Sequence, residues 1–183
     1  MGALIEQAKL WGGMKHKGQT RKYTGEAYFT HCEAVAELVE RHYMEFDPIG
    51  EAAREDIVAA ALLHDVVEDT TATLEEVEDI FGKTVATYVW YLTKPPGLAG
   101  SRATRKALYN AQLNLAPKEV KVIKFYDTFH NHGSIEEHDP GFFETWMPET
   151  QRLMAAMEIQ NVMGPTIDRY FTTYGIKCGI TGI

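Results

Sequence analysis

Four ionisable side chains cluster at the end of the most apolar stretch of the chain. His64-Asp65 is followed, after two valines, by Glu68-Asp69. At about 100° per residue, these four positions would share one side of a continuous helix. Burial of such groups without partners is unfavourable, whereas a divalent metal ion converts imidazole and carboxylate into ligands. The alternative is that His64 and Asp65 only end the helix and that Glu68-Asp69 is a solvated end.

Two further candidate ligands, a histidine and an aspartate, stand at helical positions elsewhere in the chain. His31 falls in the first turn of an expected helix, and Asp127 lies mid-helix among aromatic residues, where an unpaired aspartate is unfavourable. With His64 and Asp65 they form a set of two nitrogen and two oxygen donors. This set suits Mn²⁺, Fe²⁺, Co²⁺ or Zn²⁺, with positions left for water and substrate. His31 could instead be a surface histidine, and Asp127 part of a polar helix stripe.

The elements that must position these residues are predicted to be helices. Apolar residues recur at helical spacing along almost the whole chain, and convincing strand alternation is absent. We expect a central buried helix over residues 51–68, because its 57–63 stretch is apolar all round. Two capping boxes are expected, in which Thr30 and Thr73 begin helices. A later helix is expected to begin at Pro117 and to stop near Gly133.

Composition indicates one globular domain rather than a disordered or fibrous chain. The 183 residues are 45% hydrophobic and 24% charged. With 18 Lys and Arg against 26 Asp and Glu, the net charge is −8, which argues against nucleic-acid binding through broad electrostatics. An anionic ligand would need a local basic patch.

We find no signal peptide, no apolar stretch of about 20 residues and only two cysteines, so we expect a cytoplasmic protein without membrane contact.

The motifs of this chain, taken together, resemble those of a known family. The sequence is similar to the HD-domain metal-dependent phosphohydrolases, and within them to the hydrolase branch of the RelA/SpoT family and its small alarmone hydrolases. The matching segments, in family order, are HKGQTRK (16–22), YFTH (28–31), AALLHDVVEDT (60–70), TLEEVEDIFG (73–82) and KFYDTFHN (124–131). Two departures are Cys32, where the family has proline, and the aromatic residues around Asp127.

The resemblance implies an all-α HD-domain helical bundle and a role for each matching residue. His31, His64, Asp65 and Asp127 would hold the metal ion, with Mn²⁺ as the expected cofactor. Glu68 and Asp69 would orient or deprotonate the attacking water. We expect one HD domain over residues 1–160, an unplaced tail over 161–183, and no synthetase or regulatory domain after residue 160.

Six cationic or polar residues are candidate contacts for a small phosphorylated nucleotide. Three match family positions, and Lys124 could meet a phosphate or pair with Asp127. The other two follow the 95–100 loop, where together with Arg102 they are a candidate phosphate clamp or ordinary surface cations. In chain order these residues are Arg21, Lys22, Arg105, Lys106, Lys124 and Asn131.

The activity that the resemblance implies is removal of the 3′-pyrophosphate from (p)ppGpp, giving GDP or GTP and pyrophosphate. Two alternatives stay open at this point. One is an HD phosphohydrolase acting on another nucleotide, such as a NADPH 2′-phosphatase. The other is a nucleotide-binding sensor without turnover, against which the intact Glu68-Asp69 pair argues. The sequence does not indicate an oligomeric state.

Overall fold

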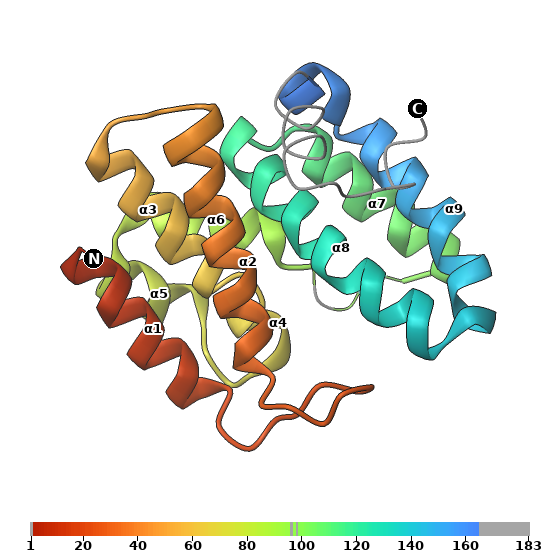
Figure 1. Cartoon of the computed structure of the whole chain (residues 1–183), viewed down its shortest axis with the longest axis horizontal. Coiled ribbons are helices and arrows are strands. Elements are labelled where there is room, and N and C mark those ends of the chain that lie inside the picture. Colours follow the sequence, from red (N-terminus) through yellow and green to blue (C-terminus); the bar gives the residue numbers. More distant parts are fainter. Residues whose placement is uncertain (1, 96, 98, 165–183) are drawn as a thin grey trace. The chain divides into compact units, whose positions relative to one another are not determined.

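The computed structural model describes residues 2–95, 97 and 99–164. Within these residues the chain is all-α, as expected, and the only extended pairing is an isolated bridge between Thr20 and Ala27. The elements (Figure 1) are α1 (Ala3–Lys15), α2 (Phe29–Arg41), the π-helical η1 (His42–Phe46), α3 (Glu51–Leu62), α4 (Val66–Asp69), α5 (Leu74–Phe81), α6 (Lys83–Leu92), α7 (Arg102–Asn114), α8 (Lys118–His138) and α9 (Pro140–Ala156).

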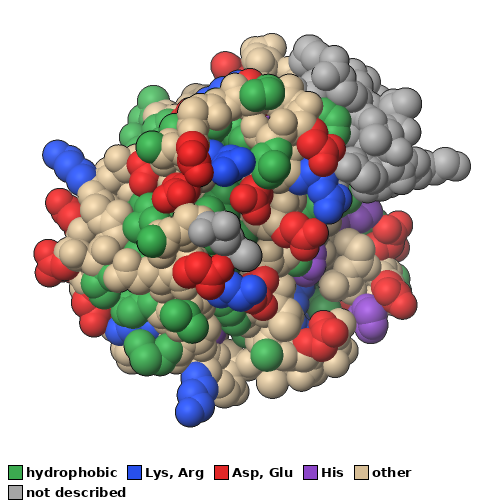
Figure 2. Space-filling view, turned by 60° about the vertical axis from the view of Figure 1, so that its left-hand side comes forward, with side chains coloured by type: hydrophobic (Ala, Val, Ile, Leu, Met, Phe, Trp, Pro, Cys, Tyr) green, Lys and Arg blue, Asp and Glu red, His purple; other side chains and the backbone are tan. Residues whose placement is uncertain are grey.

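The chain divides into two compact units, Met1–Lys94 and Pro95–Ile183. Our division into one domain over 1–160 and a tail over 161–183 stays a prediction, and residues 165–183 of that tail lie outside the described residues. No helix of the described chain is long and apolar enough to cross a bilayer. On the face shown in Figure 2, acidic and basic side chains lie intermixed.

The first unit is built around α3. This helix packs against α1, α2 and α6, and every residue from Ile57 to Leu63 is buried. The prediction of a central helix that is apolar all round is therefore confirmed. Its end differs from the expectation, because α3 stops at Leu62 and does not continue to residue 68.

A break in the helix separates α3 from the acidic segment. Residues 63–65 form a turn, with Leu63 at φ −105°, ψ 5° and Asp65 at φ −102°, ψ −3°, and the one-turn helix α4 follows. These dihedrals lie in the bridge region, where turn and active-site residues are often found. The prediction of one continuous helix through His64, Asp65, Glu68 and Asp69 is therefore wrong, whereas Tyr28 interacts with both Asp65 and Asp69.

The two predicted capping boxes have different outcomes. Thr73 caps α5 and Glu76 reaches back to its backbone, as expected. Thr30 does not cap α2, which begins one residue earlier at Phe29. The Thr30 hydroxyl donates to the carbonyl of Ala27 at 2.8 Å instead. The correction reflects the loop before α2, whose last turn already has helical dihedrals at Tyr28.

The second unit contains α7, α8 and α9, with α9 packed against both other helices. Pro117 precedes the first residue of α8, but α8 passes through Gly133 and ends at His138, so the expected stop is wrong. The apolar face of α8 extends to the buried Ile135, and packing of that face favours continuation of the helix. Asp139 then begins α9 by accepting a hydrogen bond from the backbone N–H of Phe142.

Candidate metal and catalytic site

Three of the predicted metal ligands lie together in the first unit. His31 comes from the first turn of α2, and His64 and Asp65 come from the break after α3. Both imidazole rings are buried, with ring centroids 5.2 Å apart. The Oδ2 atom of Asp65 lies 3.1 Å from Nε2 of His64 and 3.9 Å from Nε2 of His31. These atoms form a His/Asp cluster that could bind a divalent metal ion.

The hydrogen bonding of His64 fits a metal ligand. Its Nδ1 atom lies 2.8 Å from the carbonyl oxygen of Ala61, so Nδ1 carries the proton and donates it. In the neutral ring Nε2 then has a lone pair, and it faces the carboxylate oxygen of Asp65. Two acceptors at 3.1 Å repel each other unless a cation or a proton lies between them. A backbone carbonyl that fixes the tautomer of a ligating histidine is the usual arrangement in metal sites.

Cys32 adds a soft donor beside this cluster. Its buried sulfur and one ligand atom each of His64 and Asp65 all lie within 4.8 Å of one another. The sequence drew attention to Cys32 only as a departure from the family pattern. The structure places its thiol among atoms that can bind a metal ion.

Tyr28 contacts the same carboxylate oxygen of Asp65 that faces the two histidines. Its hydroxyl donates to Oδ2 of Asp65 at 2.5 Å. Burial, followed by the negative charge of Asp65, raises the pKa of Tyr28 far above its ordinary value. The phenol therefore stays protonated and acts as a permanent donor to the carboxylate.

The two expected catalytic carboxylates both keep access to solvent but have different surroundings. Glu68 is paired with Lys94, whose Nζ lies 2.5 Å from Oε1. Asp69 carries an elevated pKa, because desolvation by nearby protein atoms and then the charge of Asp65 disfavour its ionised form. The nearby Tyr28 hydroxyl acts in the opposite direction. An elevated pKa makes a carboxylate a better proton acceptor near neutral pH.

Asp127 belongs to the second unit, where it is buried on α8. Lys124 donates to its Oδ2 at 2.6 Å, and Asn131 donates to its Oδ1 at 2.8 Å. The three residues share one face of α8, at spacings of three and four positions. Lys124 also lies over the ring of Tyr109, with Nζ 5.7 Å from the ring centroid. Both carboxylate oxygens of Asp127 are held in fixed directions.

The predicted basic contacts fall into two groups, one in each unit. In the first unit, the Arg21 guanidinium lies 6.0 Å from the ring centroid of Tyr28, and Lys22 donates to the hydroxyl of Tyr23. This group follows α1 and precedes α2 in the chain.

The second group, on α7, makes contacts within its own unit. Arg105 donates to the carbonyl of Gly100 at 2.7 Å. Lys106 lies 2.5 Å from the Glu149 carboxylate, which also accepts a two-pronged hydrogen bond from Arg102. Two members of the expected phosphate clamp, Arg102 and Lys106, are therefore already paired with a carboxylate of α9.

Four residues around these side chains were not identified as functional from the sequence. They are Gln19, Tyr28, Lys94 and Glu149. Gln19 and Tyr28 stand inside the matching segments, which was the one available signal. Their partners lie far away in the chain: Gln19 donates to the carbonyl of Asp69, 50 residues later, and Tyr28 reaches Asp65, 37 residues later. Sequence patterns of helical period do not report contacts at such separations.

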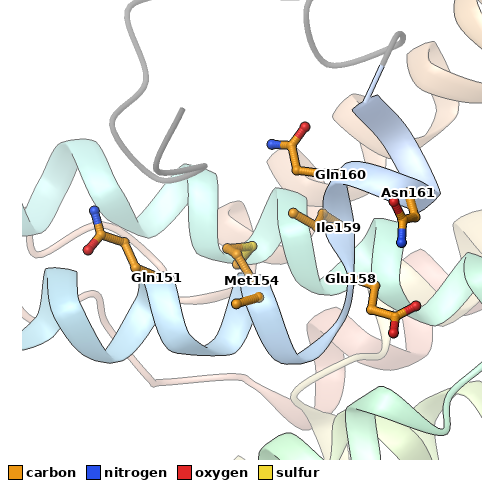
Figure 3. A pocket seen from close by; sticks show the side chains of 7 residues that line it. Gln151, Met154, Glu158, Ile159, Gln160 and Asn161 are labelled. Carbon is orange, nitrogen blue, oxygen red and sulfur yellow. The ribbon is translucent and has the colours of Figure 1, made fainter.

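A separate hollow in the second unit contains none of the predicted site residues. It has a volume of about 550 Å³ and lies where α9 ends (Figure 3). Its described lining residues are Gln151, Met154, Ala155, Glu158, Ile159, Gln160 and Asn161. The charged side chain among these is an acid, which disfavours a phosphorylated ligand.

Comparison with known proteins finds similarity to curated proteins named as (p)ppGpp synthase/hydrolases and GTP pyrophosphokinases. The bifunctional (p)ppGpp synthase/hydrolase SpoT of Escherichia coli K12 is 33% identical over 131 residues, which are 69% of this chain and 17% of that protein. The GTP pyrophosphokinase rsh of Brucella melitensis is 29% identical over 171 residues, or 91% of this chain and 20% of that protein. The chain thus spans about a fifth of the length of these relatives.

Two solved structures share the fold. One is a metazoan SpoT ortholog, described as hydrolysing ppGpp, with a TM-score of 0.77 and 24% identity, covering 97% of this chain and 98% of that one. The other is lmo0812 of Listeria monocytogenes EGD-e, with a TM-score of 0.59 and 29% identity, covering 75% and 84% of the two chains. Residues 12–118, more than half of the chain, match the HD domain family. The chain therefore belongs to the HD domain family.

Proposed function

We propose that this chain hydrolyses the 3′-pyrophosphate ester of (p)ppGpp and depends on a divalent ion, with Mn²⁺ as the expected one. Water adds to the phosphorus atom bonded to O3′, the P–O3′ bond breaks, and O3′ takes up a proton. The products are GDP or GTP and pyrophosphate. The observation that carries the proposal is the His31, His64 and Asp65 cluster, followed one turn later by Glu68 and Asp69, in a chain of the HD domain family.

Four residues would hold the ion: His31, His64, Asp65 and Asp127. The first three supply buried imidazole and carboxylate donors in the first unit. Asp127 is included because it stands in the matching 124–131 segment and is itself buried with both oxygens oriented. When bound, a divalent ion lowers the pKa of its water and offsets phosphate charge.

Glu68 and Asp69 would handle the proton of the attacking water. Asp69 has solvent access and a raised pKa, both useful for a base that works near neutral pH. Glu68 is oriented by Lys94, which limits the directions in which its carboxylate can point. A protein that only bound nucleotides would have no need for two carboxylates beside a set of metal ligands.

The nucleotide would be bound by cations, because the net charge of −8 gives no general attraction for a polyphosphate. Arg21 and Lys22 in the first unit and Asn131 in the second match family positions, and Lys124 lies in the matching 124–131 segment. Arg105 and Lys106 are weaker candidates, since Lys106 is already paired with Glu149. The names of the curated relatives support the choice of a guanosine tetraphosphate or pentaphosphate as substrate.

The test is a substrate comparison on the purified full chain. Metal-free protein is supplied with Mn²⁺ and, in separate reactions, with ppGpp, pppGpp, NADPH or GTP. Pyrophosphate and inorganic phosphate are measured independently. We expect pyrophosphate release from ppGpp and pppGpp, loss of that release with EDTA, and its return when Mn²⁺ is restored.

Glu68→Gln serves as the matched inactive control in the same reactions. Phosphate release from NADPH without pyrophosphate release from ppGpp would replace the proposed substrate by the alternative one. Binding of ppGpp without any turnover would identify the chain as a sensor. Either result would overturn the proposed activity.

A further inference from the structure

The loop between α1 and α2 is closed at its base by two residues, Gln19 and Tyr28. The backbone N–H of Tyr28 donates to the carbonyl of Gln19 at 3.0 Å, and Thr20 and Ala27 form the bridge just inside. A further bond from the N–H of Arg21 continues this pairing toward the loop tip. Because these bonds cross the loop, its two base residues are held as one unit.

The side chains of both base residues contact the acidic segment, residues 65–69. The Tyr28 hydroxyl donates to Oδ2 of Asp65 at 2.5 Å, at the start of the segment. The Gln19 amide donates through Nε2 to the carbonyl oxygen of Asp69 at 2.6 Å, at its end. One loop base thus contacts both ends of the segment that carries a proposed metal ligand and a proposed catalytic carboxylate.

His16 fixes the orientation of both base residues. Its Nδ1 atom lies 2.7 Å from Oε1 of Gln19, and since an amide oxygen only accepts, His16 is the donor. The Gln19 amide is thereby turned so that its NH₂ group faces Asp69. The imidazole ring also stacks on the Tyr28 ring, with centroids 5.1 Å apart and an interplanar angle of 24°. At 2% exposure, His16 has little freedom to release either partner.

The acidic segment needs such outside support. Its helix α4 has only four residues and no side-chain cap at its N-terminus. The bond from the N–H of Asp69 to the carbonyl of Asp65 closes a single helical turn. A single turn is unstable in isolation, because the entropy cost of nucleation is not recovered by further bonds.

We propose that Gln19 and Tyr28, locked by His16, are positioning residues that hold Asp65 and Asp69 in their working directions. This inference rests on the proposed function, since it assigns the two aspartates their metal-binding and catalytic tasks. Tyr28 acts on metal affinity, because it orients the carboxylate of a ligand. Gln19 acts on turnover, because it fixes the backbone from which the Asp69 side chain projects.

The experiment compares two isosteric variants with two matched controls in the full chain. Tyr28→Phe removes only the hydroxyl, and Gln19→Met removes the amide at nearly constant size. The controls are Tyr91→Phe on α6 and Gln7→Met on α1, the same substitutions on other elements. For each protein, Mn²⁺ affinity is measured by calorimetry on metal-free protein, kcat and KM are measured with ppGpp, and thermal unfolding is followed without metal.

We expect Tyr28→Phe to weaken Mn²⁺ binding by roughly 10-fold to 100-fold, the usual effect of removing a residue that orients a ligand. Gln19→Met should keep the Mn²⁺ affinity of the parent and lose kcat by roughly 10-fold or more at unchanged KM, since misplacement of a catalytic group acts on the transition state. Both controls should match the parent in all three measurements. If Gln19→Met fails to fold, Gln19→Asn replaces it, because its amide is too short to reach Asp69.

The outcomes separate this inference from the proposed function. A parent protein that binds Mn²⁺ and hydrolyses ppGpp, with Tyr28→Phe and Gln19→Met equal to their controls, overturns the positioning role alone. A lowered melting temperature with unchanged Mn²⁺ affinity and unchanged kcat also overturns it, since the two residues would then be only structural. A parent that neither binds Mn²⁺ nor turns over ppGpp overturns the proposed function and this inference together.

Discussion

Lys94 contacts both carboxylate oxygens of Glu68. Its ammonium lies 2.5 Å from Oε1, and its backbone N–H donates to Oε2 at 3.3 Å. Lys94 is the last residue of the first unit and directly precedes Pro95. A carboxylate held at both oxygens has a defined direction, so this contact orients one of the two proposed catalytic groups.

Lys94→Met should therefore reduce turnover much more than it reduces stability. The Lys94 side chain is 56% exposed, and exposed ion pairs contribute about 0–1 kcal/mol to folding. Loss of orientation at Glu68 should lower kcat by roughly 10-fold to 100-fold. Lys83→Met, at an exposed lysine of α6, is the control. Equal kcat values for the two variants, measured as pyrophosphate release, would contradict the orienting role.

Glu68→Gln should keep the metal ion and lose most of the activity. The amide preserves size but cannot accept the proton of water, so kcat should fall by roughly 10²-fold to 10⁴-fold. Mn²⁺ affinity, measured by calorimetry, should stay at the value of the parent. Glu75→Gln on α5 provides the matched control. Turnover by Glu68→Gln at the parent rate would transfer the proton-accepting role to Asp69.

Asp127→Ala should remove metal-dependent stabilisation. In the metal-free protein, the loss of the bonds from Lys124 and Asn131 should cost about 1–3 kcal/mol, because these partners are left within a buried site. Added Mn²⁺ should then raise the melting temperature of the parent but not of the variant.

Lys124→Met distinguishes the two effects of Asp127→Ala. This variant breaks the same ion pair but keeps the carboxylate, so it should lose metal-free stability and still respond to Mn²⁺. A normal response of Asp127→Ala to Mn²⁺ in thermal unfolding would exclude Asp127 from the ligand set.

Arg21→Ala should raise KM more than it lowers kcat. The guanidinium can contact phosphate or base at positions remote from the reacting phosphorus, so its removal acts mainly on binding. Added salt should weaken substrate binding in the parent more than in the variant. The control is Lys17→Ala, at an exposed cation near the same loop. An unchanged KM for every nucleotide tested would remove Arg21 from the substrate contacts.

The Glu149 ion pairs should make stability depend on acidic pH. The hydrogen bond from Arg102, aided by Lys106 and opposed by burial, lowers the pKa of the Glu149 carboxyl from 4.5 to about 2. Because the folded pKa lies below the unfolded one, the contribution is fully present above about pH 4.5. It is lost as the pH falls toward 2.

Urea unfolding of Glu149→Gln checks this dependence. The variant should be less stable than the parent at pH 7, by no more than about 1 kcal/mol, since Arg102 and Lys106 are well exposed. The two proteins should converge as the pH approaches 2. Glu144→Gln, an exposed position on the same helix, should track the parent throughout. A constant difference between Glu149→Gln and the parent across this pH range would contradict the ion-pair explanation.

Local features could be predicted from the sequence because their causes lie within a few residues. The buried stretch of α3 follows from its continuous apolar residues, and the Thr73 capping box follows from side chains three positions apart. The contacts of Asp127 with Lys124 and Asn131 follow from helical spacing. The matching segments also indicated the family, which the comparisons confirm.

Only the tertiary structure decided the conformation of the acidic segment and the residues that contact it. The break at Leu63, the passage of α8 through Gly133 and the start of α2 at Phe29 are three places where the surrounding structure overrides weak local signals. The partners of Asp65 and Asp69 come from a loop 37 and 50 residues away. The residue types by themselves determined which chemistry was available, whereas chain folding determined which of those groups meet, because contacts between distant residues have no periodic signature in the sequence.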